Sequence, residues 1–310
     1  MIHLLKTIPN GVYPTMVTPY TKGNKIDYNA VLKLIEWYCD RGVAGIFAIC
    51  QSSEIFYLTL AEKIELLDFI VKNTPKDITI IASGHTEDDL DEQIYQANKI
   101  IDIGIDAYVF IANRFAKEDE DDGVFLNNAQ YVYKSLPEEV GLGIYECPYP
   151  YKRLLSPEVL RELALTGRFQ FLKDTCCDAE EIGRKILAVE GTGLKIYNAN
   201  AATLLDTMRL GCSGYSGVMA NFHPELYAWL CNNYEKEPDR AEIMQDFLGF
   251  ASIAECQLYP INSKYYLQLE GLGTEIFSRV RDSSEFIDSR KLETKQMRQS
   301  TFFFKKAFGF

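Results

Sequence analysis

The chain has 310 residues, of which 47% are hydrophobic and 13% aromatic, so it can bury a large core and is not expected to be disordered. Its formal net charge of −12 disfavours nucleic acid and anionic membrane surfaces as partners. No apolar run approaches the ~18 residues of a membrane span, and residues 1–11 lack the apolar core of a signal peptide. These features predict a soluble protein of the cytoplasm.

The cysteines and histidines give no sign of a metal centre. Eight cysteines are scattered through apolar segments without a CxxC pair, and there are only three histidines, of which His85 is expected to be structural. We therefore expect buried, reduced thiols and no zinc site. The acidic run 117–122 could bind a cation, but we interpret it as a solvated loop that leads into a helix N-terminus.

Segments typical of strands and helices alternate eight times along the first two thirds of the chain. The predicted strands are 11–20, 43–49, 78–82, 107–112, 141–145, 169–173, 194–197 and 214–219. Helix-start signals follow several of them, such as Asp27, the Thr59/Glu62 capping box, and Ser156 before Pro157.

After residue 223 the pattern becomes wholly helical. The predicted helices there are 224–234, 238–256, 260–270 and 290–307. Together, the two parts predict an α/β protein: a (β/α)8 TIM barrel over residues 1–223, with a C-terminal helical segment, residues 224–310, packed on it.

In such barrels, the residues that act chemically lie at the carboxyl ends of the strands. That rule selects Thr18, Gln51, Ser52, Asn113, Arg114, Tyr145, Glu146, Lys173, Asn198, Asn200 and Ser216. Among these, Thr18 and Ser216 are candidates for substrate binding.

The most informative candidate is Lys173, because it ends the buried run Phe169–Leu172. A desolvated amine has a lowered pKa and can attack a carbonyl carbon. With Tyr145 on the neighbouring strand as a proton donor and acceptor, such a lysine could form an imine with a ketone and stabilise a carbanion beside it. The alternative is that Lys173 only marks the strand end, with its ammonium group in water.

Several short motifs, in order, carry a resemblance to a known family. They are MVTPY (16–20), CQSSE (50–54) followed by Leu58-Thr59, Tyr145-x-x-Pro148, LSPE (155–158), Lys173, GCSG (211–214), VMAN (218–221) and YPINSK (259–264). On these motifs the chain resembles the dihydrodipicolinate synthase/N-acetylneuraminate lyase family of class I pyruvate-type aldolases, from about Gly11 to at least Arg281.

The resemblance implies roles for individual residues. Lys173 would form the imine with a 2-keto acid, and Tyr145 would be the acid/base phenol. Ser52, with Gln51 and Ser53 beside it, would hold the keto-acid carboxylate through a hydroxyl and backbone N–H groups. The family needs no metal or organic cofactor and forms tetramers, so a homo-oligomer without a cofactor is expected.

Departures from the family pattern disfavour dihydrodipicolinate synthesis itself. Gln51 replaces a loop hydroxyl that passes protons, and Ser53 replaces a glycine. Residues 112–115 lack the family's second tyrosine, and Pro150 stands where the synthases have an arginine. The missing loop hydroxyl also disfavours sialic-acid cleavage.

The substrate pocket is therefore predicted to be rebuilt around Gln51, Asn113, Arg114 and Tyr149. Arg114 at the mouth would suit an acidic or polyhydroxylated 2-keto acid, such as a sugar acid. An ion pair between Arg114 and the acidic loop 118–122 is an equal alternative.

Two functions from different classes follow. The first is a Schiff-base-forming lyase that catalyses aldol cleavage, condensation or dehydration on pyruvate or a larger 2-keto acid. The second is a barrel that has lost turnover and binds a keto acid or amino acid as a sensor or scaffold. The retained pair of Lys173 and Tyr145 favours the enzyme, because an unpaired buried amine is costly to keep without a use.

Overall fold

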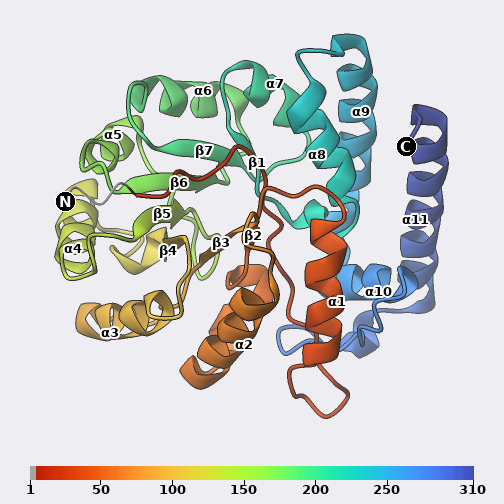
Figure 1. Cartoon of the computed structure of the whole chain (residues 1–310), viewed down its shortest axis with the longest axis horizontal. Helices are drawn as coiled ribbons and strands as arrows, with labels where there is room; N and C mark the ends of the chain where they lie inside the picture. Colours follow the sequence, from red (N-terminus) through yellow and green to blue (C-terminus); the bar gives the residue numbers. More distant parts are fainter. Residues whose placement is uncertain (1–4) are drawn as a thin grey trace.

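Eight parallel strands form the centre of the computed structural model, which describes residues 5–310 (Figure 1). The strands are β1 (Gly11–Val12), β2 (Gly45–Phe47), β3 (Thr79–Ala82), β4 (Ala107–Ile111), β5 (Gly141–Tyr145), β6 (Phe169–Asp174), β7 (Lys195–Asn198) and β8 (Gly214–Tyr215). Residues 1–4, part of the stretch predicted to lack a signal peptide, lie outside the described chain. The predicted (β/α)8 barrel is confirmed.

The strands follow the order β1-β8-β7-β6-β5-β4-β3-β2 around the barrel. Bonds between the first and last strands of this order close it: the Ala44 N–H donates to the Val12 carbonyl at 3.0 Å, and Thr15 forms a parallel bridge with Phe47. A Cβ at Gly214 would lie 1.9 Å from the Gly11 carbonyl oxygen, so β8 can approach β1 only with glycine there.

Two predicted strands are much shorter than expected. The segment 11–20 forms a regular strand only over Gly11–Val12, with a single further bridge to the sheet at Thr15, and Pro14 between them has no N–H to donate to a ladder. The segment 214–219 leaves the sheet after Tyr215 and turns into the 3₁₀ helix η4 (Val218–Asn221). The other six strands lie within about two residues of their predicted ends, the usual uncertainty of such boundaries.

Helices surround the strands in the alternation that the sequence predicts. They are α1 (Tyr28–Cys39), α2 (Leu60–Asn73), α3 (Leu90–Ile101), α4 (Asp122–Lys134), α5 (Pro157–Leu165), α6 (Ala179–Ala188), α7 (Leu204–Arg209) and α8 (Pro224–Asn233). The predicted caps are present: Asp27 and Ser156 each accept a backbone N–H, and Thr59 and Glu62 form the capping box. Asp121 caps α4, which confirms that the acidic run leads into a helix.

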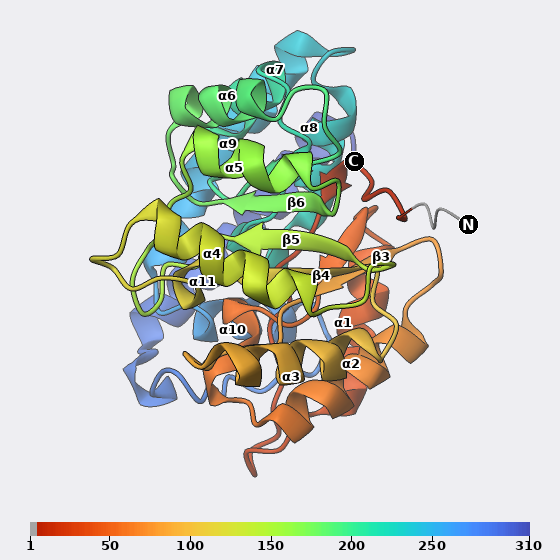
Figure 2. The same ribbon diagram turned by 90° about the vertical axis from the view of Figure 1, so that its left-hand side faces the viewer.

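The C-terminal segment is helical, as predicted. It begins with α8 and continues with α9 (Pro238–Ala251), α10 (Ile261–Leu269) and α11 (Asp288–Phe308). The predicted helix 238–256 is wrong at its end, since it changes at residue 252 into the 3₁₀ helix η5 (Ser252–Cys256). Helix α8 packs against β1 and β8, and the three later helices lie on that side of the barrel (Figures 1 and 2). The division into residues 1–223 and 224–310 stays a prediction.

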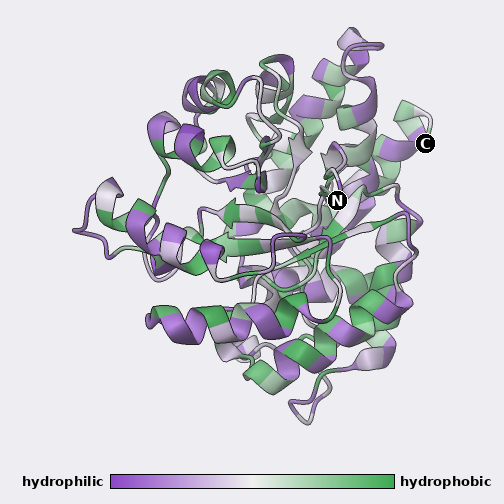
Figure 3. Ribbon diagram, turned by 60° about the vertical axis from the view of Figure 1, so that its left-hand side comes forward, coloured by the Kyte–Doolittle hydropathy of each residue, from purple (hydrophilic) through white to green (hydrophobic). Residues whose placement is uncertain are grey.

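The apolar side chains gather where strands and helices meet. The strands are largely hydrophobic, and the helices carry both hydrophobic and hydrophilic residues, with the apolar ones turned toward the core (Figure 3). Within residues 5–310, no helix combines the length and the apolar character needed to cross a membrane.

A buried ion pair ties the C-terminal segment to the barrel. Glu54 follows β2, and its carboxylate accepts from Lys264 Nζ on α10 at 2.5 Å, from the Ser278 hydroxyl and from the Arg279 N–H. The side chains of Glu54 and Lys264 are both fully buried. Backbone φ at Glu54 is +63°, so the left-handed residue of this loop is Glu54 rather than Ser53.

We predict that Lys264→Met lowers the free energy of unfolding by about 3–5 kcal/mol, because Glu54 would keep a buried charge without its partner. Urea unfolding would measure the change, and Lys72→Met, which breaks an exposed pair with Asp68, is the control at about 0–1 kcal/mol. Equal losses in the two variants would contradict the assignment.

Candidate active site

Lys173 lies inside the barrel, near the carboxyl end of β6. Only 3% of the residue is exposed. Tyr145 on β5 is its partner in register, and Lys173 Nζ lies 4.4 Å from the centroid of the Tyr145 ring. Among residues 5–310, no side chain or carbonyl forms a hydrogen bond or ion pair with this Nζ. The interpretation of Lys173 as a strand-end lysine in water is therefore wrong.

Burial changes the protonation of this lysine. Desolvation lowers the pKa of Lys173 to about 8, opposed only in part by Cys50, Cys147 and Glu255. The neutral amine is then roughly a few hundredfold more abundant at pH 7 than for an exposed lysine. Such an amine is a nucleophile at neutral pH.

Tyr145 presents its hydroxyl to the loop after β2. The hydroxyl donates to Gln51 Oε1 at 3.0 Å, and Gln51 begins the 3₁₀ helix η1 (Gln51–Ser53). Burial raises the pKa of the Tyr145 phenol well above its usual value. The phenol is therefore protonated at neutral pH, with its hydrogen directed at an amide oxygen that can accept a hydrogen bond but has no proton to pass on.

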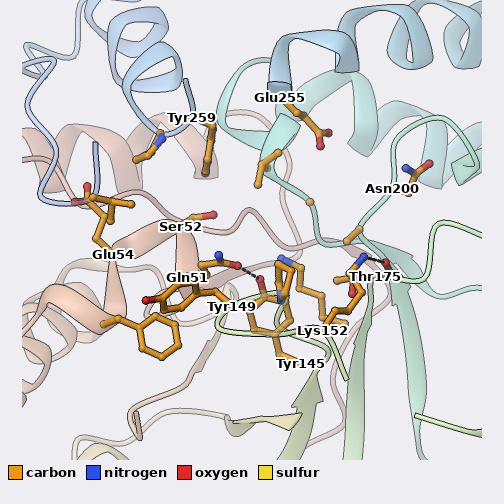
Figure 4. A pocket seen from close by; sticks show the side chains of 18 of the residues that line it. Gln51, Ser52, Glu54, Tyr145, Tyr149, Lys152, Thr175, Asn200, Glu255 and Tyr259 are labelled. Atoms are coloured by element: carbon orange, nitrogen blue, oxygen red, sulfur yellow. Dashed lines mark hydrogen bonds between the residues drawn. The ribbon is translucent and has the colours of Figure 1, made fainter. Parts of the chain in front are cut away.

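A cavity of about 490 Å³ opens at this end of the barrel and contains both side chains. Figure 4 shows Gln51 and Tyr145 below it, Tyr259 and Glu255 above it, and Lys152, Thr175 and Asn200 toward the right. Of the residues selected from the sequence, Lys173, Tyr145, Gln51, Ser52, Tyr149 and Asn200 line this cavity. The structure thus brings together residues from β5, β6 and the loops after β2, β5 and β7.

Three other predicted site residues donate hydrogen bonds from their hydroxyls to backbone carbonyls. Thr18 donates to the Ser53 carbonyl at 2.8 Å, and Ser216 donates to the Tyr13 carbonyl at 3.0 Å. Ser53 donates to the Met16 carbonyl at 2.7 Å. These residues do not line the cavity, and their bonds hold the loops that surround it.

Asn113 and Arg114 also lie outside the cavity lining. The Asn113 amide donates to the carbonyls of Cys147, Tyr149 and Tyr151, so it shapes the loop after β5. Arg114 pairs with Asp88 at 2.7 Å, and not with the acidic loop 118–122 as the alternative prediction had it. The loop residue Asp122 pairs with Arg153 instead.

Several charged or polar residues line the cavity without having been selected from the sequence, and four of them follow β5 or lie in the C-terminal part of the chain. Lys152 follows β5, Glu255 lies on η5, Tyr259 precedes α10, and Arg281 follows that helix. None of them stands at the end of a barrel strand, so the strand-end rule cannot find them. Tyr259 lies in the YPINSK motif, and that motif was the only feature of the sequence that could have pointed to any of the four.

A fully buried charge cluster lies directly beside the two central side chains. Lys185 on α6 donates to Glu146 at 2.7 Å and to Asp174 at 2.5 Å, and all three side chains have no exposed surface. Glu146 and Asp174 follow Tyr145 and Lys173 in the chain. Burial raises the pKa of Glu146, as does the nearby Asp174 carboxylate. Burial disfavours the Lys185 ammonium, but the two carboxylates outweigh this and raise its pKa.

Metal-ligating side chains do not cluster in the described part of the chain. Across residues 5–310, no group of three or more His, Cys, Asp and Glu is placed to hold a metal ion. His85 is structural, because its ring nitrogens bond to the Tyr108 hydroxyl and the Ile111 N–H.

Sequence comparison matches residues 8–281 to the Dihydrodipicolinate synthetase family. The 4-hydroxy-tetrahydrodipicolinate synthase of Thermodesulfovibrio yellowstonii is 28% identical over 228 residues, which cover 73% of this chain and 75% of that protein. The protein of the same name from Pseudoalteromonas atlantica is 24% identical over 295 residues, or 94% and 98% of the two chains.

Solved structures share the fold at lower identity. A dihydrodipicolinate synthase from Bacillus anthracis superposes with a TM-score of 0.86 at 18% identity, covering 96% of this chain and 99% of that one. A dihydrodipicolinate synthase from Acinetobacter baumannii, complexed with pyruvate, gives a TM-score of 0.84 at 22% identity, covering 94% and 98%.

We predict that Lys185→Met lowers the free energy of unfolding by about 3–5 kcal/mol at pH 8, because two carboxylates remain buried without their cation. The folded-state pKa of Glu146, which burial already raises, would then rise further above its unfolded value. The loss should shrink as the pH falls toward 5, where the folded state takes up the protons.

Urea unfolding at pH 8 and pH 5 would measure both effects. The neighbouring Arg184→Met, which breaks only exposed pairs with Glu180 and Glu181, is the matched control. A loss that is independent of pH would show that the carboxylates do not depend on Lys185.

Proposed function

Because the chain belongs to the Dihydrodipicolinate synthetase family, we propose that it is a Schiff-base-forming lyase acting on pyruvate or a larger 2-keto acid. The observation that carries the proposal is the buried, unpartnered amine of Lys173 beside the ring of Tyr145 in the cavity. Pyruvate is also the ligand named for one solved relative of the same fold.

In the proposed reaction, the neutral Lys173 amine attacks the C2 carbonyl of the keto acid. Loss of water gives an iminium ion, whose nitrogen accepts the electron pair released when a bond at C3 breaks. The Tyr145 hydroxyl supplies a proton to the C2 oxygen as it leaves. The lysine itself is the electron sink, so this chemistry requires no metal or organic cofactor.

The keto-acid carboxylate would bind beside the loop after β2. Ser52 lines the cavity, and its hydroxyl bonds to Thr15 Oγ1 at 3.0 Å. Backbone N–H groups at the start of η1 lack partners within the turn and can complete an anion site with this hydroxyl. Gln51, whose amide accepts from Tyr145, would position the phenol.

The lining of the cavity also suits a polar or anionic substituent on a larger keto acid. Lys152 and Arg281 line it, and neither has an ion-pair partner within residues 5–310. Lys152 Nζ donates only to the Thr175 carbonyl, at 2.9 Å. These cations take the part that the sequence assigned to Arg114, and they favour an acidic substrate such as a sugar acid.

One observation favours the second candidate, a barrel that binds a keto acid or amino acid as a sensor or scaffold without turnover. The Tyr145 hydroxyl donates to the Gln51 amide oxygen, and because an amide has no proton to pass on, a proton relay through this loop is interrupted. The same change disfavours dihydrodipicolinate synthesis. A homo-oligomeric assembly and a cytoplasmic location stay predictions.

The first test is trapping with pyruvate and borohydride, read by intact mass and peptide mapping. We expect a stable adduct on Lys173 that is lost in Lys173→Ala. Lys63 is an internal control, because burial also lowers its pKa to about 8, yet it bonds to Gly84 and Thr86 outside the cavity. No adduct with pyruvate or longer 2-keto acids, in a folded protein, would favour the sensor or scaffold.

The pH dependence of adduct formation tests the state of the amine. The initial rate with pyruvate should rise between about pH 7 and 9, with a midpoint near the Lys173 pKa of about 8, because the neutral form is the nucleophile. Cyanoborohydride trapping over that range, followed by mass spectrometry, would give the profile. A midpoint near the ordinary lysine value would mean that the amine is not desolvated.

A further inference from the structure

Of the carboxylates in residues 5–310 that line the cavity, Glu255 is the one without a hydrogen-bond or ion-pair partner. It lies on η5, between α9 and α10, and lines the same cavity as Lys173. Its carboxylate forms no hydrogen bond or ion pair with any other residue in the range 5–310. The cavity's other carboxylate, Glu54, accepts from Lys264, Ser278 and Arg279 and is therefore occupied.

Glu255 lies on the side of the cavity opposite Tyr145 and Gln51. Figure 4 shows its side chain approaching the cavity from the side of Tyr259, across from Tyr145 and Gln51. A substrate bonded to Lys173 and held through its carboxylate near Ser52 would extend its remaining carbons toward this open space. A carboxyl group there can exchange a proton with substituents beyond C3. The Tyr145 hydroxyl is less well placed for that transfer, because it donates its hydrogen bond to Gln51.

The surroundings of Glu255 allow both protonation states near neutral pH. Burial raises the pKa of its carboxyl group to about 7, and the only charged group that opposes this is Lys173 on β6. The titratable groups that interact with it from the other elements are the hydroxyls of Tyr215, Tyr227 and Tyr259, which burial keeps protonated. An acid–base group works best under such conditions.

The other candidates in the cavity are poorly suited to move a proton at that position. The Tyr145 hydroxyl donates to Gln51, and burial raises the pKa of the Tyr259 phenol far above its usual value, so that this phenol is not a base at neutral pH. Lys152 and Arg281 are cations that can only donate hydrogen bonds while charged. Lys173 would be consumed in the imine.

We propose that Glu255 is a catalytic residue, the general base and acid for the C4 oxygen of a 4-hydroxy-2-keto acid held as an imine on Lys173. This rests on the proposed function. In cleavage, the Glu255 carboxylate removes the C4 hydroxyl proton, the C4–O bond becomes a carbonyl, and the C3–C4 bond breaks. Its electron pair forms the C2–C3 double bond of an enamine, while the iminium π electrons move onto nitrogen. In condensation, the carboxylic acid returns the proton.

The test compares wild type with Glu255→Gln in two reactions that differ only in the C4 step. Trapping with pyruvate, together with deuterium exchange at pyruvate C3, reports imine and enamine formation without a C4 oxygen. Cleavage of a panel of 4-hydroxy-2-keto acids, followed by released pyruvate, adds the C4 step. Glu190→Gln is the matched control, because Glu190 is an exposed residue between α6 and β7, outside the cavity.

We expect Glu255→Gln to retain pyruvate trapping and C3 exchange, with rates changed only by the loss of the Glu255 charge near Lys173, while its kcat for cleavage falls about 10²- to 10⁴-fold. Glu255→Asp should recover part of the loss, and Glu190→Gln should cleave normally. In Glu255→Gln the residual rate should also lose the rise with pH near 7 that wild type shows.

Two results would overturn the assignment of Glu255 while leaving the imine chemistry intact. One is cleavage by Glu255→Gln at the wild-type rate and with the wild-type pH profile. The other is pyruvate trapping by the wild type without cleavage of any substrate in the panel. Failure of the wild type to trap any keto acid would instead remove the proposed function, and this inference with it.

Discussion

The buried cluster of Lys185, Glu146 and Asp174 is the constraint on which the candidate site depends. Glu146 and Asp174 directly follow Tyr145 and Lys173, so one ammonium group on α6 fixes the ends of β5 and β6 against each other. Glu146 also accepts the N–H groups of Leu155 and Thr175. A buried ion pair adds little net stability over apolar packing, but it defines geometry strongly, because each partner is costly to leave alone.

Most of the barrel could be predicted because its signals are local. Buried strands of four to six residues, capping residues such as Ser156, and regular alternation identify β3 to β7 and their helices. The ends of β1 and β8 could not be predicted, since the length of these strands depends on how the barrel closes. Pro14 limits the hydrogen bonds of β1, and β8 can approach β1 only because Gly214 has no side chain. Such closure is a property of the assembled sheet.

The residues of the candidate site also fall into those that the sequence could predict and those that it could not. The strand-end rule finds Lys173 and Tyr145, because the period of a strand determines where its last side chains point. It selects Asn113 and Thr18 as well, although the structure uses them to hold loops. Glu255 and Arg281 belong to the C-terminal segment and reach the cavity only through tertiary packing, which Glu54 and Lys264 secure. No spacing in the sequence places them near Lys173.

The cavity has a carboxyl group, that of Glu255, although its cations favour an anionic substrate. The charges around Glu255 explain how the two are compatible. Lys173, Lys152 and Arg281 give the cavity a positive character within a chain of net charge −12. A half-buried carboxylate there would repel an acidic substrate, but a Glu255 with a pKa of about 7 is partly neutral when the substrate arrives. Once an iminium ion forms, its fixed positive charge favours the carboxylate again. The group would thus change toward its basic form at the step that needs a base.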